Sequence, residues 1–133
     1  MENNTNSSQT GNNQIPRIHH KIDATDRIPG RLASEIAILL MGKHKVTYQP
    51  YLDQGDFVEI SNVAKMKFTG KKLDQKSFYS FSGFPGGLKT IGLGKLFKDN
   101  PEEVLRKIVH RMLPKNKLRQ EMIKRLTFKS DKE

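Results

Sequence analysis

Apolar side chains recur along this chain at two spacings, which predict where its helices and strands lie. A spacing of three and four residues predicts a helix over 29–41, with an apolar stripe of Leu32, Ala33, Ile36, Ala37, Leu39 and Leu40. Gly42 follows directly and suits the left-handed turn that ends many helices. Apolar runs at 18–24 and 57–60 predict a strand on each side of the helix. A strand–helix–strand order of this kind indicates a right-handed crossover between parallel strands.

The middle of the chain has weaker patterns. The run at 65–68 predicts a short strand, 69–76 an exposed basic loop and 77–81 an extended segment. The segment that follows, Gly83-Phe84-Pro85-Gly86-Gly87, is incompatible with regular structure.

The last third is helical in pattern. Asn100 is placed to cap a helix that begins at Pro101, and Glu103 completes an arrangement resembling a capping box. The predicted buried stripe of this helix is Val104, Leu105, Ile108, Val109 and Met112. Pro114 ends the helix, a second short helix is predicted over 117–124, and 126–128 predicts a closing strand.

These elements fit one domain, as expected for 133 residues. Residues 1–17 are almost wholly polar and are expected to be a disordered tail, followed by a domain over 18–129 and a short tail over 130–133. The absence of Cys excludes disulfides and thiolate catalysis. No apolar run approaches the ~20 residues that span a bilayer, and no secretory signal opens the chain, so we expect a cytoplasmic protein.

Charge is distributed unevenly along the chain. Residues 1–60 carry six Lys and Arg against seven Asp and Glu, a net charge of −1, whereas residues 61–133 carry a net charge of +11. A one-sided positive field of this size favours a polyanionic partner such as nucleic acid.

Three basic segments are candidates for phosphate contacts. Lys43, His44 and Lys45 follow a helix end, where cations either stabilise the helix dipole or bind phosphate. For the segment 114–119 we favour a phosphate contact over a solvated turn. Aromatic residues between 68 and 84 alternate with lysines. Such rings either form a stacking platform or, more commonly, belong to the core, so the lysines are the better RNA candidates.

Catalytic patterns are poor. Thr69-Gly70-Lys71-Lys72 lacks the earlier glycine of a nucleotide-binding loop, and no serine lies in a nucleophile elbow. Asp53 and Asp56 are consistent with a metal site but fit a turn better. We therefore expect no catalytic residue, metal or cofactor. A free RNA-binding regulator and, less favoured, a small nucleotide-binding enzyme remain the alternatives.

An ordered set of motifs resembles ribosomal protein thirteen of the large subunit, in its bacterial-type form. The matching segments are Asp23–Asp26, Gly30–Ser34, Gly42–Lys45, Tyr48–Pro50, Asp53–Asp56, Asn62, Thr69–Lys72, Ser82–Lys89 and Met112–Leu118. The resemblance implies a three-layer α/β/α domain around a four-stranded, mostly parallel sheet. It also implies a structural protein without enzymatic activity, which binds large-subunit ribosomal RNA directly, joins early in subunit assembly and has neighbouring ribosomal proteins as partners.

The resemblance also implies the RNA-contact residues that stand inside the motifs: Lys43, His44, Lys45, Lys71, Lys72, Lys115, Asn116 and Lys117. Positive charge adds Lys67, Lys76, Lys89, Arg111 and Arg119. The chain departs from the family pattern where Arg17-Ile18-His19-His20 replaces the usual aromatic residues. It departs again where Ile91-Gly92-Leu93-Gly94 replaces a helix-forming stretch, which argues against a short helix there, and at Arg119, where the family commonly has Gly.

Overall fold

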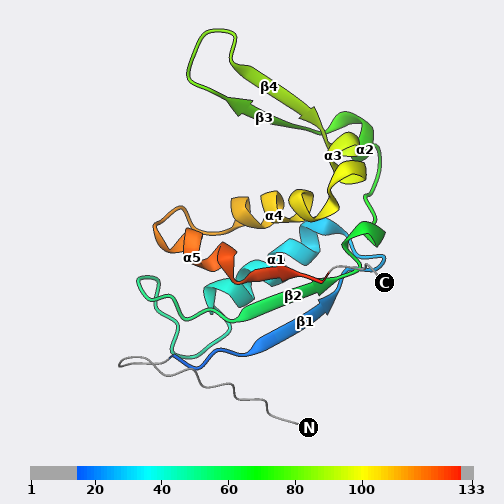
Figure 1. The fold of residues 1–133 in the computed structure, drawn as a ribbon. Coiled ribbons are helices and arrows are strands. Elements are labelled where there is room, and N and C mark those ends of the chain that lie inside the picture. Colours follow the sequence, from blue (N-terminus) through cyan, green and yellow to red (C-terminus); the bar gives the residue numbers. More distant parts are fainter. Residues whose placement is uncertain (1–14, 130–133) are drawn as a thin grey trace.

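The computed structural model describes residues 15–129, in which strands and helices are interspersed along the chain (Figure 1). Residues 1–14 of the predicted N-terminal tail and the whole predicted C-terminal tail, 130–133, lie outside this range. Within it, the fold is a mixed α/β arrangement in which a parallel sheet and its helices form the body of the protein.

The predicted strand–helix–strand unit is confirmed. Strand β1 (His19–Asp23) pairs in parallel with β2 (Phe57–Ser61), and α1 (Pro29–Met41) connects them. Proline opens α1, where its missing N–H costs no hydrogen bond. Gly42 ends the helix with φ 79°, as expected. A Cβ at this position would also lie 2.6 Å from the Gln54 carbonyl oxygen, so glycine is required there for two reasons.

The sheet is smaller than the resemblance implies. Strand β5 (Leu126–Phe128) pairs in parallel with β2, which gives a three-stranded sheet of order β1-β2-β5 rather than a four-stranded one. The expected fourth strand is replaced by a separate antiparallel pair. Helices cover one face of the parallel sheet, and on the opposite face His19, Lys21 and Thr127 are exposed within the described range. The expected three-layer arrangement is therefore not formed by residues 15–129.

The separate pair is a hairpin that stands away from the body (Figure 1). Its strands are β3 (Ser77–Phe81) and β4 (Leu88–Gly92), and the irregular segment predicted at 83–87 forms the connecting loop. Phe78 is the buried residue at its base, where it packs with Leu93 and Val104. The rest of the hairpin is largely exposed.

Two predictions for the middle of the chain are wrong. The strand expected at 65–68 is absent: a 3₁₀ turn, η1 (Val63–Lys65), precedes an irregular segment, because Val63 and Met66 are buried against the core and set the path of the chain. The basic loop expected at 69–76 contains one helical turn, α2 (Lys72–Gln75).

The short helix that the sequence argued against does form, as α3 (Leu93–Asp99). Leu93 is 1% exposed, and Leu96 and Phe97 pack against the same small cluster. A Cβ on Gly94 would lie 2.8 Å from the Leu73 carbonyl oxygen, so the glycine lets α3 approach α2 closely. Tertiary packing thus overrides the low helix propensity of this segment.

Helix α4 (Pro101–Met112) begins as predicted, with the Asn100 side chain accepting a hydrogen bond from the Glu103 N–H at 3.3 Å. Its stripe is confirmed at Val104, Leu105 and Val109, whereas Met112 is 41% exposed. Helix α5 (Leu118–Lys124) follows. The main core lies where α1 and α4 pack over Val58 and Ile60 of β2. Among the helices of residues 15–129, none combines the length and the apolar character needed to cross a membrane.

Candidate nucleic-acid interface

A cationic hollow of about 240 Å³ lies between the hairpin and α4. Lys89 reaches it from β4, and Lys107, His110 and Arg111 reach it from α4. The Arg111 guanidinium lies 5.1 Å from the centre of the Phe78 ring, a cation–π contact that joins the helix to the base of the hairpin. The fold therefore brings together Lys89 and Arg111, two of the predicted contact residues.

The pKa of His110 is lowered by burial and by the positive charges around it. Burial lowers the pKa below its ordinary value, and the charges of Arg119, Arg111 and Lys107 lower it further. Lys107 also lies 3.4 Å from Glu103, an exposed pair that offsets only part of the local charge. An anion placed in the hollow would interact favourably with all of these groups.

A second basic site lies around the start of α1. Lys72 and Lys76 border a smaller hollow of about 120 Å³, whose lining is mostly apolar and includes Phe68, Leu93 and Ile108. Lys71 is exposed beside them. Because the lining of this hollow is apolar, the ammonium groups of these lysines lie at its rim, in contact with water.

The α4–α5 connection is a third basic site. Lys115 and Lys117 are exposed, as a phosphate contact requires. The predicted contact residue Asn116 has a role within the fold, because its side-chain oxygen accepts a hydrogen bond from the Arg119 N–H at 3.2 Å in the first turn of α5.

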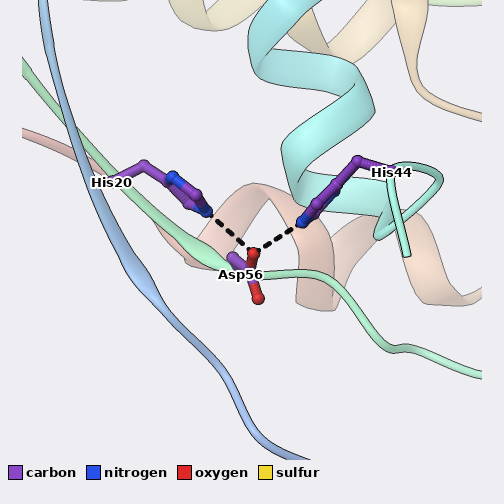
Figure 2. Close-up of side chains that lie close together, drawn as sticks. All are labelled: His20, His44 and Asp56. Atoms are coloured by element: carbon purple, nitrogen blue, oxygen red, sulfur yellow. Dashed lines mark hydrogen bonds and ion pairs between the residues drawn. The ribbon is translucent and has the colours of Figure 1, made fainter. Parts of the chain in front are cut away.

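Two of the predicted contact residues are used inside the protein. The Lys45 ammonium lies 2.8 Å from Asp56 Oδ1 and donates to the carbonyl oxygens of Gln54 and Pro16, at 2.7 and 2.9 Å. His44 Nε2 is hydrogen-bonded to Asp56 Oδ2 at 2.9 Å (Figure 2). Their neighbour Lys43 is exposed, so of this basic turn Lys43 is the cation best placed for a partner.

Asp56 is the centre of this network rather than part of the turn that the sequence favoured. Its side chain is fully buried and accepts hydrogen bonds from Lys45, His20, His44 and the Ile18 N–H. Burial alone would raise the Asp56 pKa, but the donation from Lys45, His20 and the Ile18 N–H outweighs it and lowers the pKa to about 2. The carboxylate therefore stays charged and fixes the turn after α1.

A second buried ion pair, which sequence reasoning missed, involves Asp53 and Arg125. The guanidinium binds both Asp53 oxygens, at 2.5 and 2.6 Å, and donates to the Leu40 carbonyl oxygen at 2.8 Å. A Cβ on Gly55 would lie 1.6 Å from that carbonyl, so the motif Asp53–Asp56 needs its glycine for close contact with the end of α1. The motif Asp53–Asp56 was visible in the sequence, but it did not reveal that Arg125 is the partner of Asp53.

The hairpin exposes aromatic rings that core packing cannot explain. Tyr79, Phe81 and Phe84 are 66, 66 and 73% exposed. Of the five rings considered in the sequence, only Phe78 is fully buried, and Phe68 is half-buried against Phe97. Exposed apolar groups clustered on a projecting arm indicate an interaction surface.

The fold and the exposed cations together define a small basic α/β protein whose surface is complementary to a polyanion. The model of the family described as Ribosomal protein L13 matches residues 17–133. A protein named large ribosomal subunit protein uL13 from Pelobacter propionicus is 51% identical over 84% of this chain and 79% of its own length. Its namesake from Aquifex aeolicus is 54% identical over 85% and 78%, and that from Thermotoga petrophila 46% identical over 85% and 76%. The chain therefore belongs to the ribosomal protein L13 family of the large ribosomal subunit.

Proposed function

We propose that this protein is a structural constituent of the large ribosomal subunit that binds ribosomal RNA directly and supports early assembly of the subunit. One observation carries the proposal: exposed lysines and arginines occupy the three basic sites and the turn after α1, and within residues 15–129 no carboxylate forms an ion pair with them. These side chains are Lys43, Lys71, Lys72, Lys76, Lys89, Arg111, Lys115 and Lys117.

Cations without carboxylate partners are free to neutralise phosphates. Lys67 differs, because its ammonium lies 3.0 Å from Asp26, although both side chains are largely exposed and the pair is weak. Affinity then arises from the release of counterions from RNA and from the fit of the cations to folded RNA, rather than from reading a linear sequence of bases.

We also propose that the hairpin contacts bases of the ribosomal RNA. A two-stranded hairpin is marginally stable in water by itself, so an arm with this composition gains stability from a partner. Tyr79, Phe81 and Phe84 offer rings on which unpaired bases stack, and Lys89 lies on the same arm. We propose that the arm enters a region of folded ribosomal RNA in which unstacked bases are accessible.

The proposal predicts a strong dependence of RNA affinity on salt. If six phosphates are neutralised, log affinity for a fragment of large-subunit ribosomal RNA should fall with log salt concentration with a slope of about −4 to −5. Filter binding between 50 and 300 mM KCl, about the range in which such slopes are resolved, measures it. A slope near zero would contradict the mechanism.

His110 should report on occupancy of the cationic hollow. A phosphate there offsets the charges of Arg119, Arg111, Lys107 and Lys89, so the pKa of His110 should rise when RNA binds. Because the bound state then holds more protons, affinity should increase as the pH falls toward and below the ordinary imidazole pKa.

Titration of the imidazole signals by NMR, with and without the RNA fragment, tests this expectation. The His19 signal is the reference, because this residue lies on the face of the sheet without helices. An unchanged or lowered His110 pKa in the complex would remove the hollow from the interface.

Sedimentation separates the proposed role from a free RNA-binding regulator or a nucleotide-binding enzyme. In a sucrose gradient of cell lysate, the protein should travel with the large subunit. Reconstitution of the subunit without it should stall at an early particle. Saturable binding of a mononucleotide by the isolated protein, without sedimentation at the large subunit, would support the enzyme instead.

A further inference from the structure

We propose that His20, His44 and Asp56 form a site for one divalent transition-metal ion of the zinc class. The two imidazoles come from separate parts of the chain, β1 and the turn after α1, and converge on one oxygen of a carboxylate just before β2 (Figure 2). His20 Nε2 and His44 Nε2 lie 2.8 and 2.9 Å from Asp56 Oδ2. The three ligand atoms all lie within 4.8 Å of one another.

This geometry is close to that of a bound ion. Zinc binds imidazole nitrogen and carboxylate oxygen at about 2.0–2.2 Å, so ligand atoms of a tetrahedral site lie roughly 3.3–3.5 Å apart. Each Nε2 atom would therefore move about half an ångström away from Asp56 Oδ2 to admit the ion. The two rings stand nearly perpendicular, at 88°, with their centroids 5.9 Å apart, and do not stack face to face on each other.

The carboxylate is already held as a metal ligand would be. Asp56 Oδ1 accepts from the Lys45 ammonium at 2.8 Å and from the Ile18 N–H at 3.2 Å, which leaves Oδ2 directed at the two imidazoles. Hydrogen bonds of this kind orient ligands in metal sites. The positive charge of Lys45 also repels the metal ion. We therefore expect weaker metal binding than at a site of two histidines and one carboxylate that has no neighbouring ammonium group.

The site is accessible on one side. The His20 and His44 side chains are 29 and 31% exposed, whereas Asp56 is fully buried. An ion can therefore enter from solvent and complete a four-coordinate shell with water. Binding would use neutral imidazoles with the proton on Nδ1, and it would tie β1, the turn after α1 and β2 together. The role of the ion would be structural, because it would stabilise the turn that carries Lys43.

Titration calorimetry of the untagged full-length protein with ZnCl₂, after chelation and dialysis, tests the site. We expect saturable binding of one ion per chain and a higher unfolding temperature with zinc. Co²⁺ should give the visible absorption typical of a tetrahedral site. The substitutions H20Q and H44Q should each weaken binding at least about tenfold, since each removes one of three protein ligands.

H19Q is the matched control. His19 is the sequence neighbour of His20 but lies on the opposite face of the sheet, where it stacks on Phe57 at 4.7 Å. This variant should bind zinc as the unsubstituted protein does. Circular dichroism in EDTA shows whether each variant folds without metal.

NMR of the unsubstituted protein keeps the test independent of variant folding. Zinc should shift the Nε2 signals of His20 and His44 and leave those of His19 and His110 in place. Three outcomes would overturn the proposal: no saturable binding, equal affinity in H20Q, or shifts confined to the other two histidines.

Discussion

Replacement of Asp56 by alanine is expected to lower the free energy of unfolding by about 3–5 kcal/mol, the usual cost of removing one partner from a buried charge pair. The substitution leaves the Lys45 ammonium, which is 18% exposed, without its carboxylate. It also leaves the Ile18 N–H and two imidazoles without an acceptor. Urea unfolding in the presence of EDTA measures the effect without a contribution from metal.

Glu121→Ala is the control for this experiment. Glu121 also forms an ion pair, with Lys124 at 3.1 Å, but both side chains are more than half exposed. Its loss should cost at most about 1 kcal/mol, as for other surface pairs. If Asp56→Ala cost no more than Glu121→Ala, the buried network would not be a main support of the fold.

Charge reversal in the basic loop should have the largest effect on RNA binding. Lys71→Glu combined with Lys72→Glu is expected to lower affinity for large-subunit ribosomal RNA about 20-fold at 0.15 M salt from lost counterion release alone, and further from repulsion. The fold should persist, because both side chains are exposed and neither forms an ion pair within the described residues. The salt slope should become shallower by about 2, since each lost phosphate contact removes close to one unit.

The matched control changes the net charge by the same amount elsewhere. Lys21→Glu with Lys129→Glu places the same charges at exposed positions outside the three basic sites, Lys21 being on the sheet face that helices leave open. Filter binding of both double variants at several salt concentrations compares them. Equal losses would mean that only net charge matters, and an unchanged affinity for Lys71→Glu/Lys72→Glu would remove this loop from the interface.

Local patterns were sufficient where a segment's structure depends on near neighbours in sequence. The helix over 29–41, the αL residue at Gly42 and the Asn100 cap are all local effects of side-chain spacing and backbone geometry. The patterns failed at 65–68 and at 93–99. There, burial of Met66 and Leu93 and the close approach of Gly94 to Leu73 decided the outcome.

The candidate interface was only partly accessible to sequence reasoning. Net charge and motif order identified the basic segments, and the exposed positions of Lys71, Lys72, Lys89 and Arg111 agree with a contact role. His44 and Lys45 were also predicted as contacts, and charge alone does not reveal that both side chains contact the buried Asp56.

Residue order alone specifies the helical spacing, the turn glycine, the caps and the +11 charge of residues 61–133. It also determined the family, through motifs whose order is specific. Contacts made in the folded protein give the sheet its three parallel strands, leave the hairpin apart with its rings exposed, and bring His20, His44 and Asp56 together. These contacts join residues far apart in the chain, and they leave no periodic signal in the sequence.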